Sequence, residues 1–197
     1  MKREQVALLV SRLTLVCLIF AFAGWVWETI HVSILAGELV DRGFLFGPIC
    51  PIYGLTMIVA YFALGTPKNP RGVLWFTSGK WYRYMIYAIA SIILPTIIEL
   101  VVGLSFDAVF GIRLWDYSHY VITFFGTEIP LHFKGYIALP ISLIWLVLLF
   151  VSMGFFFPLF LKLMEKIPPK VTKITALVLI SIMAIDVIAS SIVSLLF

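Results

Sequence analysis

Charge is the scarcest feature of this sequence. Of its 197 residues, 62% are hydrophobic and only 12% are charged, whereas a soluble globular domain carries about a quarter charged residues. The apolar residues come in long runs, and lipid solvates such a surface far better than water does. The shortage of charge therefore excludes an ordinary soluble domain, and we expect a single transmembrane domain over residues 1–197.

Cysteine, histidine and nucleotide-binding motifs are also scarce. The two cysteines and three histidines show no CxxC or HExxH spacing, so we predict no metal site and no cofactor. No GxSxG or GxxxxGK[ST] motif occurs, so we assign no catalytic residue and expect no ATPase within the chain. The net charge of +4 does not indicate nucleic-acid binding, because the basic residues lie in short segments between apolar runs rather than in a patch.

Five apolar stretches are long enough to cross a membrane. The hydrocarbon core is about 30 Å thick and takes about 20 helical residues. The five predicted spans are residues 10–36, 44–64, 83–104, 136–160 and 173–196. Glycine and proline separate the second span from the third and the fourth from the fifth. The sequence therefore predicts an all-α polytopic membrane protein with five transmembrane helices.

Lysine and arginine alternate between the two sides of these spans. The N-terminus and the segments after the second and fourth spans hold three, four and four of them, against three in total on the other side. Cytoplasmic loops carry the excess of positive charge. We therefore expect the N-terminus in the cytoplasm and, with an odd number of spans, the C-terminus outside.

Three acidic residues interrupt the apolar spans: Glu28, Glu99 and Asp186. A charged residue at mid-bilayer costs about 2.5–3.5 kcal/mol on insertion scales. All three lie in the predicted outer half, where Arg42 and Arg113 are the cations best placed to pair with them. Two interpretations stay open, an ion-paired polar plug that fixes helix packing and a polar cavity, open to the outside, that handles a cation, a proton or a polar solute.

The start of the second span is rich in helix-breaking residues. Its glycines and prolines are Gly43, Gly47, Pro48, Pro51 and Gly54. A regular helix can begin only near Ile52, and from there to Leu64 it would be about 20 Å long, which is too short for the core. We therefore expect broken or re-entrant backbone lining a site for a substrate. A proline-kinked helix start with close glycine packing is the alternative.

The loop predicted between the third and fourth spans contains an aromatic and charged stretch at 112–120. Aromatic residues suit the headgroup zone of a membrane. We expect either an amphipathic segment lying on the outer surface or a lid over the outer cavity in which Asp116 points inward.

Four sequence blocks together resemble a known family. They are Gly24–Glu28, Asp41–Gly54, Thr96–Glu99 and Leu114–Ser118, and their order and spacing are similar to those of the bacterial membrane proteins called putative ABC-transporter type IV. The resemblance covers about residues 20–120, and Asp41 departs from it, since asparagine is usual there. It implies a permease of the bacterial cytoplasmic (inner) membrane, with any ATPase as a separate cytoplasmic partner.

Three functional hypotheses follow from these residues. In the first, a transport component or small permease binds a polar or ionic solute in a cavity open to the outer face. Its predicted lining is Glu28, Arg42, Glu99, Asp116 and Asp186, and its backbone is shaped by Gly43, Gly47, Pro48, Pro51 and Gly54. The second is a membrane-embedded enzyme acting on a lipid-linked or envelope substrate, with His119 joining the acids. The third is an accessory or sensor subunit whose polar cluster is purely structural.

Overall fold

The computed structural model describes residues 3–196, which form two compact units. Unit 1 combines the two ends of the chain, up to Ile58 and from Phe156 onward, and unit 2 is Val59–Phe155. The chain passes from one unit to the other inside helix α2 (Pro51–Ala63) and inside the helical stretch Leu139–Glu165. The expectation of one transmembrane domain stays a prediction.

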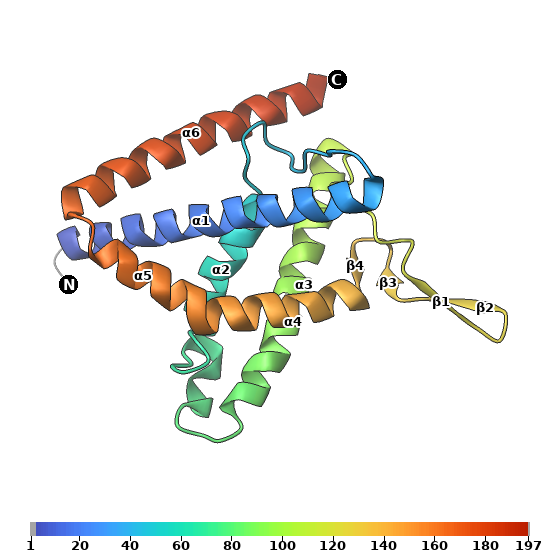
Figure 1. Ribbon diagram of the computed structural model, residues 1–197, viewed down its shortest axis with the longest axis horizontal. Coiled ribbons are helices and arrows are strands. Elements are labelled where there is room, and N and C mark those ends of the chain that lie inside the picture. Colours follow the sequence, from blue (N-terminus) through green and yellow to red (C-terminus); the bar gives the residue numbers. More distant parts are fainter. Residues whose placement is uncertain (1–2, 197) are drawn as a thin grey trace. The chain divides into compact units, whose positions relative to one another are not determined.

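Unit 1 is built on the long helix α1 (Arg3–Ala36), which packs against α5 (Phe157–Glu165) and α6 (Pro169–Leu196). Figure 1 shows α6 alongside α1 and running in the same direction. The ring of Phe20 on α1 lies 6.1 Å from that of Phe157, centroid to centroid. Phe157 is fully buried, so aromatic packing fixes the α1–α5 contact.

Unit 2 is built on the packing of α3 (Arg83–Phe110) against α4 (Leu139–Val151), with the short helix η1 (Gly72–Thr77) before α3 and the π-helical turn η2 (Ser152–Phe156) after α4. Every fourth residue of α3 is buried, in the row Tyr87, Ser91, Pro95, Glu99 and Gly103. This spacing places the row on one side of the helix. Glu99 therefore belongs to the packed face of α3.

The connection between α3 and α4 contains two small hairpins. Strand β1 (Val121–Phe124) pairs with β2 (Thr127–Pro130), and β3 (His132–Phe133) pairs with β4 (Ile137–Ala138), both antiparallel. The prediction of an all-α protein is thus wrong for this connection. Residues 112–120 form turns and bends, and their place on the outer surface stays a prediction. β-branched and aromatic residues, which favour strands, make up Val121–Phe124, and Gly126 follows in the turn.

Four helices are long and apolar enough to cross a membrane: Arg3–Ile34, Arg83–Phe110, Leu139–Glu165 and Pro169–Leu196. They carry many exposed large apolar side chains, as expected of a multi-pass membrane protein. Three of them extend the predicted spans at their loop ends, α3 for example to Phe110 instead of residue 104. The predicted second span differs more, because residues 44–50 are not helical and α2 is a 13-residue helix. Its start at Pro51 confirms the limit expected from the prolines.

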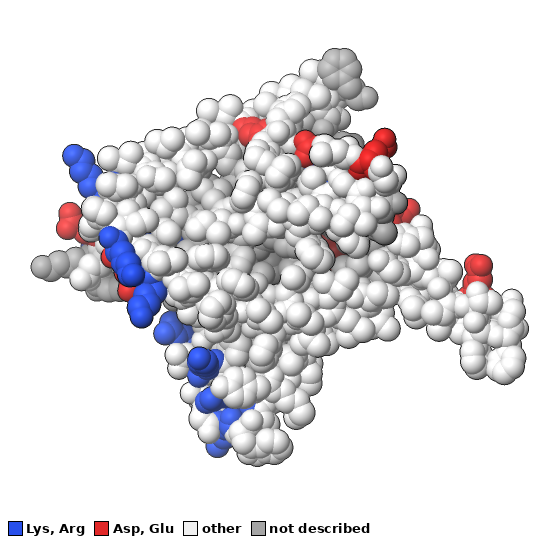
Figure 2. Space-filling view, in the orientation of Figure 1, with Lys and Arg blue, Asp and Glu red and all other residues white. Residues whose placement is uncertain are grey.

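Basic side chains gather at one place in each unit. Figure 2 shows them in unit 1 near the turn between α5 and α6, and in unit 2 near η1 and the start of α3. These positions hold Lys162, Lys166, Lys170 and Lys173 in unit 1 and Lys68, Arg71, Lys80 and Arg83 in unit 2. Each cluster lies at the end of a helix that is long enough to cross a membrane.

Candidate functional site

Two glycines allow the start of α2 to lie directly on α1. A Cβ atom on Gly54 would overlap the main-chain carbonyl oxygen of Cys17, and a Cβ atom on Gly24 would overlap the ring of Tyr53. Small residues allow this kind of backbone approach between helices in membranes. The close crossing carries Tyr53 to the face of α1 on which Glu28 lies.

Glu28, Arg42 and Tyr53 meet at this crossing. The Tyr53 hydroxyl donates a hydrogen bond of 2.9 Å to Glu28 Oε1, and Arg42 Nε lies 3.8 Å from Glu28 Oε2. The prediction that Arg42 pairs with an acid of the spans is confirmed by this contact. The distance is that of an ion pair and exceeds that of a hydrogen bond. Arg42 Nε is itself buried and donates no hydrogen bond.

Solvent reaches part of this group. The side chains of Arg42 and Glu28 are 32% and 30% exposed. Two opposite charges that are partly buried attract each other more strongly than they would in water, and they keep part of their solvation. The pair is therefore only partly covered by the rest of the protein.

The carboxylate of Asp186 on α6 binds main-chain N–H groups of the non-helical segment before α2, residues 39–50. Its Oδ1 accepts the N–H of Phe46 at 3.0 Å and its Oδ2 accepts that of Gly47 at 2.8 Å. The Ser190 hydroxyl, one turn further along α6, donates to Oδ1 at 3.2 Å. A Cβ atom on Gly47 would lie 2.9 Å from Oδ2, so glycine is needed for this approach. Asp186 thus supplies acceptors that a helix would otherwise provide.

Further contacts tie the connection after α1 to that helix. The Trp25 indole N–H donates to Asp41 Oδ1 at 2.9 Å, and the N–H of Val40 donates to the Ser33 hydroxyl at 2.9 Å. At the other end, the N–H of Cys50 donates to the carbonyl oxygen of Ala21 at 3.0 Å. The non-helical stretch is therefore bonded at both ends to α1 and at its middle to α6.

The remaining predicted backbone residues lie in this stretch. Gly43 has φ +135°, a conformation that side-chain-bearing residues rarely adopt. Pro48 lies in the turn where the N–H of Ile49 bonds to the carbonyl of Gly47 at 2.8 Å, and Pro51 is the first residue of α2, a position that proline favours. Each of these helix-breaking residues thus helps to bend the chain before α2.

Unit 2 holds a separate polar cluster on the buried face of α3. Glu99 is 4% exposed and its Oε1 accepts the Tyr117 hydroxyl at 2.9 Å. Two turns further on, Asp107 accepts the Tyr136 hydroxyl, while the Trp115 indole N–H donates to the Tyr136 carbonyl at 2.8 Å. Aromatic side chains of the following connection therefore provide the donors for the carboxylates of α3.

Asp116 bonds within its own loop. Its Oδ1 accepts the N–H of Ser118 at 2.9 Å and lies 3.5 Å from Arg113. The Ser118 N–H, joined by Arg113, holds the pKa of the Asp116 carboxyl below its usual range. The side chain is 49% exposed. It is thus Tyr117, rather than Asp116, that reaches the buried carboxylate Glu99, and Arg113 pairs with Asp116 rather than with an acid of the spans.

The five predicted lining residues therefore fall into two groups. Glu28, Arg42 and Asp186 surround the broken segment in unit 1, whereas Glu99 and Asp116 bond within unit 2. Sequence reasoning missed the tyrosines Tyr53 and Tyr117. The sequence did contain an indication of their role, because each tyrosine lies in the same sequence block as a predicted site residue. A carboxylate in an apolar span also requires a hydrogen-bond donor nearby. His119, from the enzyme hypothesis, lies against the ring of Tyr120.

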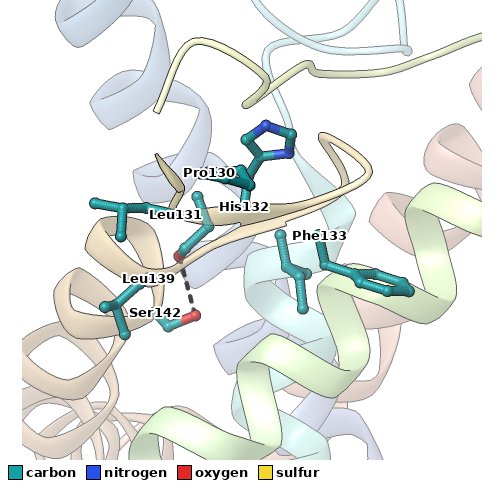
Figure 3. Close-up of a pocket in the computed structure, with 8 residues that line it drawn as sticks. Pro130, Leu131, His132, Phe133, Leu139 and Ser142 are labelled. Carbon is teal, nitrogen blue, oxygen red and sulfur yellow. Dashed lines mark hydrogen bonds between the residues drawn. The ribbon is translucent and has the colours of Figure 1, made fainter. Parts of the chain in front are cut away.

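Unit 2 also has a groove of about 410 Å³ beside the β3–β4 hairpin (Figure 3). It is lined by Pro130, Leu131, His132, Phe133, Ile137, Ala138, Leu139 and Ser142. The Ser142 hydroxyl donates to the Ala138 carbonyl at 3.1 Å. The lining is mainly apolar and includes none of the five predicted site residues. Within residues 3–196, no cluster of three or more histidine, cysteine, aspartate or glutamate side chains could hold a metal ion.

These features define a multi-pass membrane protein in which polar side chains meet beside a non-helical segment. The model of the family described as Putative ABC-transporter type IV matches residues 15–191, and the chain belongs to this family. The resemblance predicted for about residues 20–120 is confirmed and extends over the last two predicted spans. No match was found among curated proteins or among solved structures.

Proposed function

We propose that this chain is the membrane-embedded component, or permease, of a transport system and that a small polar or ionic solute binds at Glu28, Arg42 and Tyr53. The observation that carries the proposal is the convergence of an acid on α1, a phenol on α2 and a base on the non-helical backbone between these helices. Irregular backbone at membrane depth persists where it is buried in protein or lines a wet cavity. Family membership supports a transport role.

In this proposal Asp186 and the glycines shape the site, while Glu28 and Arg42 contact the solute. The Asp186 carboxylate already accepts two N–H groups and a hydroxyl, so its hydrogen-bonding capacity is largely used. Arg42 Nε keeps an unused donor beside Glu28. A solute that enters between Glu28 and Arg42 gains charge-assisted hydrogen bonds, which are about twice as strong as neutral ones.

We infer that α2 and the segment before it make a fifth crossing. Thirteen helical residues span about 20 Å, and the stretch Gly43–Cys50 would supply the rest of a core of about 30 Å. The Asp186 contacts support this, because they satisfy backbone N–H groups that lipid could not. The excess of lysine and arginine then places the N-terminus in the cytoplasm of a bacterium, the C-terminus outside, and the Glu28 site toward the outer face.

An ATP-driven version of this transporter requires a second protein. The sequence has no phosphate-binding GxxxxGK[ST] motif, so nucleotide hydrolysis would come from a separate ATPase on the cytoplasmic side. The segments 65–82 and 161–172, which carry basic residues, are the surfaces that we propose for its docking.

The solute site is tested by binding to purified protein in nanodiscs. A panel of amino acids, amines, organic acids, sugars and inorganic ions is screened for a rise in melting temperature of the wild type, since a ligand that binds only the folded state raises it. We expect at least one solute to stabilise the wild type and to lose this effect in Glu28→Gln and Arg42→Gln. Tyr53→Phe, which removes one hydrogen bond, should weaken binding about 3- to 10-fold.

Glu38→Gln is the matched control, because Glu38 is an exposed acid of the connection after α1. It should bind the solute as the wild type does. If Glu28→Gln and Arg42→Gln lower the melting temperature but leave every solute response unchanged, or if no solute stabilises the wild type, the cluster is structural. The chain would then be an accessory subunit rather than a permease.

A further inference from the structure

We propose that the segment Val121–Leu139 binds membrane lipid, with the groove in unit 2 receiving an acyl chain and one face of the β1–β2 hairpin lying on the membrane surface. The inference is independent of the solute site, because all of its residues belong to unit 2 and it concerns the bilayer. Three observations carry it: the two-sided hairpin, its unusual turn, and the continuity of the groove with an apolar row of α4.

The register of the hairpin makes one of its faces more apolar than the other. Ile122 pairs with Ile129 and Phe124 pairs with Thr127, whereas Thr123 pairs with Glu128. Residues that pair directly lie on one face, and successive residues alternate between faces. One face thus carries three large apolar side chains, Ile122, Phe124 and Ile129, together with Thr127, and the other carries Val121, Thr123, Pro130 and the only charge of the two strands, Glu128. Both strands are exposed along their full length.

The turn of this hairpin places a phenylalanine where the backbone disfavours it. Phe125 and Gly126 both have positive φ, +48° and +77°, as in type I′ turns, for which Asn-Gly is the preferred pair. A bulky side chain is disfavoured in this left-handed conformation. Phe125 is also 93% exposed. Its ring meets that of Phe124 edge-on, with the centroids 4.5 Å apart, but this contact buries little of Phe125. Insertion of the ring into a membrane surface would account for a phenylalanine at this strained position.

The groove is continuous with a surface of α4 that faces lipid. Leu139 lines the groove and begins an exposed row with Leu143, Val147 and Val151 at four-residue spacing. Such spacing keeps the row on one side of the helix, and α4 belongs to the helix Leu139–Glu165, which is long and apolar enough to cross a membrane. Lipid that covers this row therefore reaches the groove through Leu139.

The chemistry of the groove suits a hydrocarbon chain. Figure 3 shows Leu131 and Leu139 on one side and Phe133 on the other. The Ser142 hydroxyl, a polar group of the lining, donates to the Ala138 carbonyl and accepts the hydroxyl of Thr96 at 2.8 Å. Its hydrogen bonds are thus made within the protein. A polar solute would find little to bond, whereas an acyl chain buries apolar surface at about 25 cal/mol per Å².

Spin labels test both parts of the proposal. Single cysteines replace Ile122, Phe125 and Phe133, with Thr123 and Glu128 as controls on the other face of the hairpin. The background is Cys17→Ala/Cys50→Ala. If that background does not fold, the wild type, whose cysteines are free, provides the labelling blank. Each variant is placed in nanodiscs of phosphatidylethanolamine and phosphatidylglycerol, and collision with oxygen, which concentrates in lipid, is compared with collision with a water-soluble nickel complex.

We expect the oxygen-to-nickel accessibility ratio at the first three positions to exceed that of the controls by at least threefold. A ratio equal to that of the controls would place the hairpin in water and overturn the proposal. Shielding of the labels from both reagents would also overturn it, because the surface would then be covered by protein, either a second copy or another partner. A high ratio at 122 and 125 but not at 133 would retain the hairpin and reject the acyl chain in the groove.

Discussion

At the scale of single residues, the three acids predicted within apolar spans each accept hydrogen bonds from identified donors. Glu28 accepts a tyrosine hydroxyl and lies near an arginine, Glu99 accepts another tyrosine, and Asp186 accepts two main-chain N–H groups. Burying a carboxylate without such partners is costly. These contacts explain how the chain keeps acids within its apolar helices.

The contacts of Asp186 predict a specific loss of stability. Asp186→Ala leaves the N–H groups of Phe46 and Gly47 without their acceptors, and a buried unpaired donor costs about 1–3 kcal/mol. Because Phe46 is largely exposed, we expect the free energy of unfolding to fall by about 2 kcal/mol in total. Thermal unfolding in detergent measures this, and proteolysis within residues 39–50 should become faster.

Two variants bracket this result. Asp186→Asn keeps one acceptor oxygen and should lose about half as much stability. Ser190→Ala removes only the hydroxyl that bonds to Asp186 and should cost less than about 1 kcal/mol. An Asp186→Ala protein as stable as Ser190→Ala would contradict the role assigned to the carboxylate.

At the scale of elements, the start of α2 is the most constrained part of the described chain. Pro51 opens the helix at the position where its missing N–H does no harm, and Gly54 follows three residues later against the backbone of α1. The helix therefore begins where proline permits it and crosses α1 where glycine permits it.

This crossing predicts that Gly54→Ala is poorly tolerated. The added Cβ would overlap the main-chain oxygen of Cys17, and backbone cannot rotate away as a side chain can. Overpacking of this kind costs about 1–3 kcal/mol, so the melting temperature should fall and the Tyr53–Glu28 contact should loosen. Thermal unfolding of the variant measures the first effect.

Gly154→Ala is the matched control for the crossing. Gly154 also lies in a helical segment, but a Cβ atom there would be 3.7 Å from Pro67, an ordinary contact. It should be neutral or stabilising by up to about 1 kcal/mol, since alanine favours helix. Equal destabilisation by both substitutions would mean that helix flexibility, rather than the approach to α1, explains the need for glycine.

At the scale of the whole molecule, the number of crossings decides on which side each polar group lies. Four helices are long enough to span a membrane by themselves, and α2 is the short fifth. Two long helices, α3 and Leu139–Glu165, separate the two groups of basic residues in Figure 2, so both groups are expected on the same side of the membrane. If α2 crosses together with Gly43–Cys50, that side is also the side of the N-terminus. If it does not, the side of every later segment is reversed.

Reporter fusions distinguish these topologies. Alkaline phosphatase, which is active only outside the cytoplasm, is fused after Ser78, after Phe125 and after Leu196. With five crossings and a cytoplasmic N-terminus, we expect no activity at Ser78 and activity at Phe125 and Leu196. Activity at Ser78 with loss of activity at the other two positions would show that α2 does not cross. Green fluorescent protein at the same sites provides the reciprocal control.

Local sequence was sufficient for a large part of this fold. Long apolar runs predicted α1, α3, the helix Leu139–Glu165 and α6, because a helix that must satisfy its own backbone in lipid needs little help from its neighbours. The prolines placed the start of α2 within one residue. The two hairpins were missed because strand pairing is a contact between segments, and short runs such as Val121–Phe124 carry no distinct helix or strand period.

The sequence predicted which types of residue would form the candidate site, but only some of the contacts between them. Arg42 was expected to pair with an acid of the spans and it lies near Glu28, 14 residues away along the chain. Asp186 was expected to line a cavity. Its bonds to Phe46 and Gly47 join residues 140 and 139 positions apart, and no local pattern indicates which backbone groups a distant carboxylate will meet.

The sequence by itself determined that this chain enters a membrane, which segments form its long helices, and where glycine and proline prevent a helix before Pro51. Those properties depend on composition and on residues a few positions apart. Only the tertiary structure decided which carboxylate meets which donor and which loop residue reaches a helix. Such contacts depend on how helices pack, and packing brings together side chains whose sequence separation carries no information about their distance.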